Sequence, residues 1–254
     1  MSAPSADGGV GVCQGDGTPW LLEIAGLSKR FDLHEANRRV VACCGIHLRL
    51  RPGEFVGITG KSGSGKSTIL RSVYRTNLPQ AGSIWYDSAR FGRIDLARTD
   101  ERSMVWLRRF EIGYISQFLS VLPRTTAFDA VLQSALDSVE EQGEDALERA
   151  RSEARRLLAH FDLPTTLWGL YPRTFSGGEK LRLNIAMAMI KRPRLLLLDE
   201  PTASLDNASK LKVRELIERL KEDGTTMLGI FHDLDFMEGI CDREHNMQEG
   251  LLDG

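Results

Sequence analysis

The segment with the most recognisable chemical role is residues 60–68, with the sequence Gly-Lys-Ser-Gly-Ser-Gly-Lys-Ser-Thr. They fit the phosphate-binding loop pattern, in which a glycine and four further residues precede Gly-Lys-Ser/Thr. Gly60 and Gly65 let the backbone take conformations that a Cβ would forbid and approach phosphate oxygens closely. The N–H groups of the loop then point at the anion, reinforced by the positive end of the following helix. The segment therefore predicts binding of a nucleoside triphosphate.

The side chains of this loop have separate expected roles. Lys66 would reach the β- and γ-phosphates, Ser67 would supply a hydroxyl to Mg²⁺, and Thr68 would lie on the α-phosphate side. The alternative is a Gly/Ser-rich turn with a chance lysine. It is disfavoured because residues 54–59 have the pattern of a buried strand and residues 68–73 that of a helix. The residues expected to contact nucleotide are Gly60, Ser62, Gly63, Ser64, Gly65, Lys66, Ser67 and Thr68.

A second chemical element is the leucine run at residues 195–198, which is followed by Asp199 and Glu200. An apolar strand that ends in two acids places Asp199 at the carboxyl edge of a parallel sheet, beside the phosphate loop. Asp199 would hold Mg²⁺, and Glu200 would orient or deprotonate an attacking water. Alone, this pattern fits a strand followed by a solvated acidic turn equally well; together with the loop, it favours a metal site.

Ser176, Gly177 and Gly178 precede a helix predicted over residues 179–191. Ser176 is a good N-cap, and the two glycines leave the helix N-terminus bare for an anion. A capped helix without a ligand is the simpler interpretation. A second phosphate-binding surface would instead favour a nucleotide held between two protomers.

The sequence Phe-Ser-Gly-Gly-Glu at residues 175–179 resembles the signature of the ATP-binding cassette (ABC) family, usually Leu-Ser-Gly-Gly-Gln. Phe175 and Glu179 depart from the usual letters, while the Ser-Gly-Gly centre is intact. The resemblance covers residues 20–250. It implies ATP and Mg²⁺ as ligands and a homo- or heterodimer with a second ABC subunit, in which each site uses both chains.

The resemblance also implies roles for residues elsewhere. Phe31 would stack on adenine, Gln117 would sense Mg²⁺ and the lytic water, and His232 would contact the γ-phosphate. A core aromatic residue and a structural histidine are the alternatives for Phe31 and His232. Asp206 belongs to a segment that resembles the loop crossing the dimer interface. The predicted catalytic residues are Glu200, Gln117 and His232, and the predicted metal-site residues are Ser67, Gln117 and Asp199.

Five stretches, at residues 74–82, 116–124, 175–179, 184–186 and 229–233, together resemble the L-type ATP-binding subunits (PhnL) of the bacterial carbon–phosphorus lyase system. This resemblance implies association with a multi-subunit core complex and a second ABC subunit, PhnK. It also implies a link to synthesis of ribose 1-methylphosphonate 5-triphosphate and to phosphonate breakdown.

Two other functions fit the same motifs. One is the cytoplasmic ATPase subunit of an ABC membrane transporter or lipoprotein-release system, because catalytic motifs serve the nucleotide and not the partner. The other is a binding module that assembles on ATP without hydrolysing it, against which Glu200 and His232 argue.

Composition narrows the function classes. A net charge of −2 over 254 residues favours neither nucleic acid nor anionic lipid as a partner. We expect a cytoplasmic protein without direct membrane insertion, because we see no leader segment and no apolar run of roughly 18 residues. The cysteines lack metal or cluster spacing, so the chain is not a radical subunit, and Cys43 and Cys44 are expected to pack in the core. The four cysteines are Cys13, Cys43, Cys44 and Cys241.

The strand and helix patterns alternate along the chain, which predicts an α/β fold. The family resemblance implies the P-loop ABC type, with a mixed sheet core, an antiparallel β subdomain and an inserted helical subdomain. Residues 1–19 read as a disordered tail and residues 20–250 as the ABC ATPase domain, with the helical subdomain at about 118–175. Strands are expected at 20–27, 40–50, 54–59, 82–87, 92–96, 111–116, 195–198 and 225–231. Helices are expected at 68–73, 100–109, 126–139, 144–161, 179–191, 207–221 and 233–240.

Overall fold

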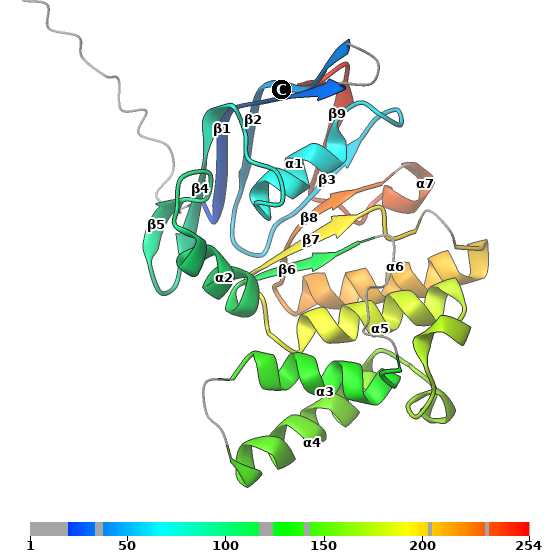
Figure 1. The fold of residues 1–254 in the computed structure, drawn as a ribbon. Helices are drawn as coiled ribbons and strands as arrows, with labels where there is room; N and C mark the ends of the chain where they lie inside the picture. The colour runs from blue at the N-terminus through cyan, green and yellow to red at the C-terminus, as the bar shows by residue number, and fades with distance from the viewer. Residues whose placement is uncertain are drawn as a thin grey trace, which may run out of the picture.

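The computed structural model describes residues 20–33, 38–116, 124–139, 143–202, 205–231 and 234–253. Two sheets and several helices make up this part of the chain (Figure 1). One sheet has four strands in the order β2-β1-β4-β5, and the other has six in the order β10-β9-β3-β8-β7-β6. Together with helices on both sides of the larger sheet, they confirm the predicted combination of a mixed sheet, an antiparallel sheet and a helical layer.

The smaller sheet is antiparallel throughout. Its inward side chains, such as Ile24, Leu48 and Tyr86, are buried, whereas Arg49, which follows Leu48 and points to the other face, is exposed. Cys43 is buried in the same way, but Cys44 points to solvent, so the expectation that both pack in the core is wrong for Cys44. The strands are β1 (Leu22–Leu33), β2 (Arg38–Leu50), β4 (Ala81–Ser88) and β5 (Gly92–Asp95).

The larger sheet is parallel except for its last strand, which pairs antiparallel with β9. β3, β7 and β8 are buried along their whole length, which explains their continuous apolar sequences. Leu196 and Leu198 pack on one face of the sheet, and Leu195 and Leu197 on the other. The strands are β3 (Phe55–Thr59), β6 (Ile112–Ile115), β7 (Leu195–Asp199), β8 (Thr226–Ile230), β9 (Arg243–Gln248) and β10 (Leu251–Leu252).

The sequence analysis missed β9 and β10. β9 is mostly polar, and only Met247 among its side chains is fully buried, so it lacks the apolar run or alternation that marks a strand. Its place in the sheet comes from parallel pairing with β3, a contact between segments almost two hundred residues apart that no local pattern encodes.

The helices cover both faces of the larger sheet (Figure 1). α1 and α2 lie with the antiparallel sheet on one side, while α5 and α6 cover the other and carry α3 and α4 beneath them. α1 begins earlier than expected, and α7 ends before Gly239, whose φ is +75°. The helices are α1 (Lys66–Val73), α2 (Glu101–Phe110), α3 (Ala127–Asp137), α4 (Glu144–His160), α5 (Gly177–Met189), α6 (Asn207–Glu222) and α7 (Leu234–Met237).

α3 and α4 pack against each other, and both contribute buried alanines to the same core, including Ala135 of α3 and Ala150 and Ala154 of α4. They stack on α5, as a helical subdomain inserted between β6 and β7 would. Its bounds at about 118–175 stay a prediction, since residues 117–123 lie outside the described residues, as does the tail at 1–19.

Candidate nucleotide and metal site

The loop between β3 and α1 has a shape that its neighbours impose. Gly65 has φ +105°, and a Cβ added there would lie 1.8 Å from the carbonyl oxygen of Ala42 in β2. A Cβ on Gly60, whose φ is +133°, would lie 2.2 Å from the carbonyl oxygen of Met247 in β9. Only glycine fits either position without a backbone shift. The loop is therefore held between β2 and β9, and residues 59–64 line a cavity of about 690 Å³ together with residues 246–249.

Lys66 lies at the start of α1 and is almost fully buried. Its Nζ donates hydrogen bonds to the carbonyl oxygens of Gly60 and Lys61, both at 2.8 Å. Burial lowers the pKa of the Lys66 ammonium, and the nearby charges of Glu200 and Asp199 oppose that shift. The Lys66 ammonium is thus held inside a loop that has no acidic side chain of its own. A phosphate bound there would supply the negative charge that pairs with it.

Ser67 and Asp199 meet at the carboxyl edge of the sheet, as the sequence analysis predicted. The Ser67 hydroxyl donates to Oδ1 of Asp199 at 2.8 Å, and the Asp199 side chain is buried. A hydroxyl and a carboxylate oxygen are the hard oxygen donors that Mg²⁺ prefers. The residues present therefore fit a magnesium ion.

Glu200 has left-handed backbone geometry, with φ +52°, and its N–H donates to the carbonyl oxygen of Ile230 at 3.1 Å. Such a conformation is uncommon for a residue with a Cβ and is often found at functional sites. It turns the chain sharply after β7, so that Glu200 follows Asp199 at the same edge of the sheet.

Ser176 caps α5 as predicted. Its Oγ accepts from the Glu179 N–H at 3.3 Å, and Oε2 of Glu179 accepts from the Ser176 N–H at 2.7 Å. The two together form a capping box. Phe175 is buried, so both departures from the usual ABC signature have structural roles, one in the core and one in the cap. Contact between this helix end and phosphate stays a prediction.

The capping box can be tested by its effect on stability. Glu179→Ala removes the acceptor for the Ser176 N–H and should lower the free energy of unfolding by about 1 kcal/mol. Glu179→Gln keeps an acceptor and restores the glutamine that is usual in the ABC signature. Its loss in free energy of unfolding should be less than half of that in Glu179→Ala. Urea unfolding followed by circular dichroism checks both; equal losses in the two variants would contradict the assignment.

Four other predicted site residues have contrasting outcomes. Phe31 is 36% exposed, with the Lys29 ammonium 5.2 Å from its ring centroid, so the core-aromatic alternative is wrong. Asp206 caps α6 by accepting from the Ser209 N–H at 2.7 Å, and these local hydrogen bonds lower the pKa of its carboxyl group. Gln117 and His232 lie outside the described residues, so their roles stay predictions.

The sequence analysis missed two side chains at the site, and a third side chain, Arg182, that lies in a separate cavity. Tyr114 and Arg71 both approach Asp199.

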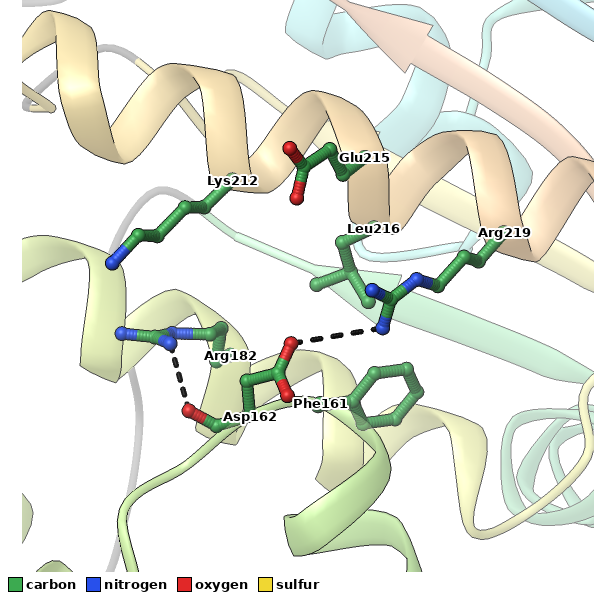
Figure 2. A pocket seen from close by; sticks show the side chains of 7 residues that line it. All are labelled: Phe161, Asp162, Arg182, Lys212, Glu215, Leu216 and Arg219. Carbon is green, nitrogen blue, oxygen red and sulfur yellow. Dashed lines mark hydrogen bonds and ion pairs between the residues drawn. The ribbon is translucent and has the colours of Figure 1, made fainter.

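Arg182 lines a second cavity, of about 260 Å³, where α5 and α6 meet the end of α4 (Figure 2). It donates to the carbonyl oxygens of Asp162 and Gly178, at 2.8 and 3.4 Å, and so ties the start of α5 to the helical layer. An arginine within a helix carries no local signal of such contacts.

A family profile described as "ABC transporter" matches residues 43–203. This chain belongs to the ABC transporter family. ABC ATPases use ATP with Mg²⁺, and membership implies ATP hydrolysis. The chain is 35% identical to the L-cystine transport system ATP-binding protein TcyN of Escherichia coli, over 91% of this chain and 88% of that protein. It is 34% identical to the lipoprotein-releasing system ATP-binding protein LolD of Pseudomonas fluorescens, over 91% of this chain and 96% of that protein.

Solved structures confirm the ABC fold. The dimeric post-hydrolysis structure of the cassette MJ0796 bound to ADP and Pi has a TM-score of 0.81 and 27% identity, over 92% of this chain and 97% of that one. The cbiO1 protein of Clostridium perfringens, part of the transporter complex cbiONQ, has a TM-score of 0.75 and 25% identity. It covers 92% of this chain and 87% of that one. None of these names refers to phosphonate breakdown, so the finer resemblance stays a prediction.

Proposed function

We propose that this chain hydrolyses ATP in a dimer of ABC subunits and thereby drives a conformational cycle in a partner. The convergence of Lys66, Ser67 and Asp199 carries the proposal, because it joins a buried cation to a hydroxyl and a carboxylate that fit Mg²⁺, beside a glycine loop. The dimer is supported by the capped helix end at Ser176 and by the dimeric cassette to which the chain is similar.

Each residue would contribute by position and charge. Lys66 and the N–H groups of the loop would hold the β- and γ-phosphates, and Phe31 would stack on adenine. Ser67 and Asp199 would hold Mg²⁺, which neutralises charge that develops on the phosphoryl oxygens. Glu200 would orient and deprotonate the attacking water, aided by Gln117 and His232. The second subunit would close the site with its Ser176, Gly177 and Gly178, and its Asp206 segment would cross the interface. Such catalysis needs positioning more than covalent chemistry.

A nucleotide site does not specify the partner, and the similar proteins favour a membrane component. TcyN is named for L-cystine transport and LolD for lipoprotein release. Within the described residues, no helix is both long and apolar enough to cross a membrane. We therefore propose a cytoplasmic ATPase subunit that acts on a membrane protein supplied by another chain.

The carbon–phosphorus lyase complex is a second candidate partner. It is favoured by the sequence Ser-Gln-Phe-Leu-Ser-Val-Leu-Pro-Arg at residues 116–124 and by the Phe-Ser-Gly-Gly-Glu signature at residues 175–179. In this alternative the chain would work with a second ABC subunit and a soluble core during phosphonate breakdown.

Affinity isolation separates the two partners. A tagged chain should be purified in parallel from cytosol and from detergent-solubilised membranes, and the co-purifying proteins identified by mass spectrometry. We expect a stoichiometric integral membrane protein from the membrane fraction. Recovery only with a soluble complex that contains a second ABC subunit would reject the transporter assignment and support the second candidate. The Lys66→Ala variant is the control for partners that depend on ATP.

A further inference from the structure

Tyr114, in the middle of β6, lies beside the proposed metal ligand. β6 and β7 run parallel, with Tyr114 opposite Leu197, so the tyrosine is on the side of the sheet to which Leu197 and Asp199 point. The Tyr114 hydroxyl donates a hydrogen bond to Oδ2 of Asp199. Ser67 donates to the other oxygen, Oδ1, at 2.8 Å. The two oxygens of this buried carboxylate therefore have different neighbours.

Arg71 strengthens the difference. It lies one helical turn after Ser67 in α1, and its guanidinium is 3.8 Å from Oδ2 of Asp199. Oδ2 is thus the oxygen that faces a hydrogen-bond donor and a cation from the protein, whereas Oδ1 faces the hydroxyl expected to bind metal. A divalent cation would meet less competition at Oδ1.

We propose that Tyr114 is a positioning residue, which fixes the rotation of the Asp199 carboxylate so that Oδ1 is presented to Mg²⁺ beside the Ser67 hydroxyl. This inference rests on the proposed function of Ser67 and Asp199 as magnesium ligands. It assigns Tyr114 no contact with the metal or the nucleotide.

The Tyr114 ring is itself held in place, as a positioning role requires. It packs against the Tyr74 ring, with 4.9 Å between the ring centroids. The Arg108 guanidinium of α2 lies over the Tyr74 ring, 4.9 Å from its centroid, and the Arg108 Nε donates a hydrogen bond to the Tyr74 carbonyl oxygen at 2.9 Å. The position of the hydroxyl is therefore set by packing from α1, α2 and β6 together. Partners of this kind orient metal ligands, and their loss typically weakens metal binding about 10- to 100-fold.

Tyr114→Phe tests the inference, because it removes one oxygen atom and keeps the ring that packs on Tyr74. Mn²⁺ serves as the probe for the magnesium site in the full-length protein with ATP. We expect its affinity, measured from the electron paramagnetic resonance signal of free Mn²⁺, to fall about 10- to 100-fold. ATP affinity in the presence of EDTA should change less than about twofold, since the phosphate-binding groups are intact. The melting temperature without nucleotide checks that the variant is folded.

Two further variants separate the possible outcomes. Tyr74→Phe removes the hydroxyl of the neighbouring ring and should leave the affinity for Mn²⁺ unchanged; an equal loss there would overturn the role of the Tyr114 hydroxyl. Asp199→Asn should weaken Mn²⁺ binding at least as much as Tyr114→Phe. Loss in Asp199→Asn without loss in Tyr114→Phe would overturn the positioning role alone. Unchanged Mn²⁺ affinity in Asp199→Asn would instead reject the proposed metal site.

Discussion

Glu200→Gln is expected to lower the rate of ATP hydrolysis about 10²- to 10⁴-fold while leaving ATP binding intact. Glu200 follows β7 directly, and its backbone is anchored to Ile230 of β8, so the carboxylate cannot move far from the metal-binding edge. Glutamine has the same size and keeps this anchor, but it cannot accept a proton from water. ATP would then stay bound, and because we propose that ATP holds the two subunits together, ATP-bound dimers should accumulate.

The measurement has two parts. Phosphate release gives the rate, and size-exclusion chromatography with ATP and Mg²⁺ gives the fraction of dimer. Glu222→Gln, at the exposed end of α6, is the matched control for loss of one negative charge and should hydrolyse ATP at the normal rate. Normal turnover by Glu200→Gln would reject its assignment as the catalytic base, and an absence of ATP binding would place the defect in the loop instead.

The parts of the fold that could be predicted are those whose physical cause is local in sequence. β3, the glycine loop and α1 follow one another without a break, so a strand pattern, a loop pattern and a helix pattern were enough to place Lys66 and Ser67. β7 has an uninterrupted apolar sequence because both its faces are buried. Its two acids must then emerge at the edge where parallel strands end, which explains why Asp199 meets Ser67 as expected.

The remaining features depend on contacts between distant segments. β9 is a strand because β3 offers it hydrogen bonds, although its own residues are mostly polar. Gly60 and Gly65 are required by the carbonyl oxygens of Met247 and Ala42, which lie on distant strands that the loop pattern does not include. Tyr114 has the size and polarity of an ordinary strand residue, and only the pairing of β6 with β7 brings its hydroxyl to Asp199. Sequence patterns thus identify ligands more readily than the residues that orient them.

The proposal that each site is shared between two subunits leads to the other large prediction. Gly177 lies at the first position of α5 and is exposed, so Gly177→Asp should fold normally, because a negative charge is favourable at a helix N-terminus. The same charge would face the triphosphate of the partner's site and repel it. Hydrolysis should fall at least about 10²-fold, comparable with the loss of one electrostatic contact to the transition state. ATP binding to the loop of the same chain should persist.

Mixing two inactive variants then tests whether the site is built from both chains. Lys66→Ala disables the loop but keeps the start of α5, and Gly177→Asp does the reverse. In a randomly mixed population, half of the dimers contain one of each variant, and each of these has one complete site. If the sites act independently, about one quarter of normal hydrolysis should return on mixing. No recovery would contradict a site shared between two copies of this chain, whereas high activity of Gly177→Asp alone would show that the helix end does not face phosphate.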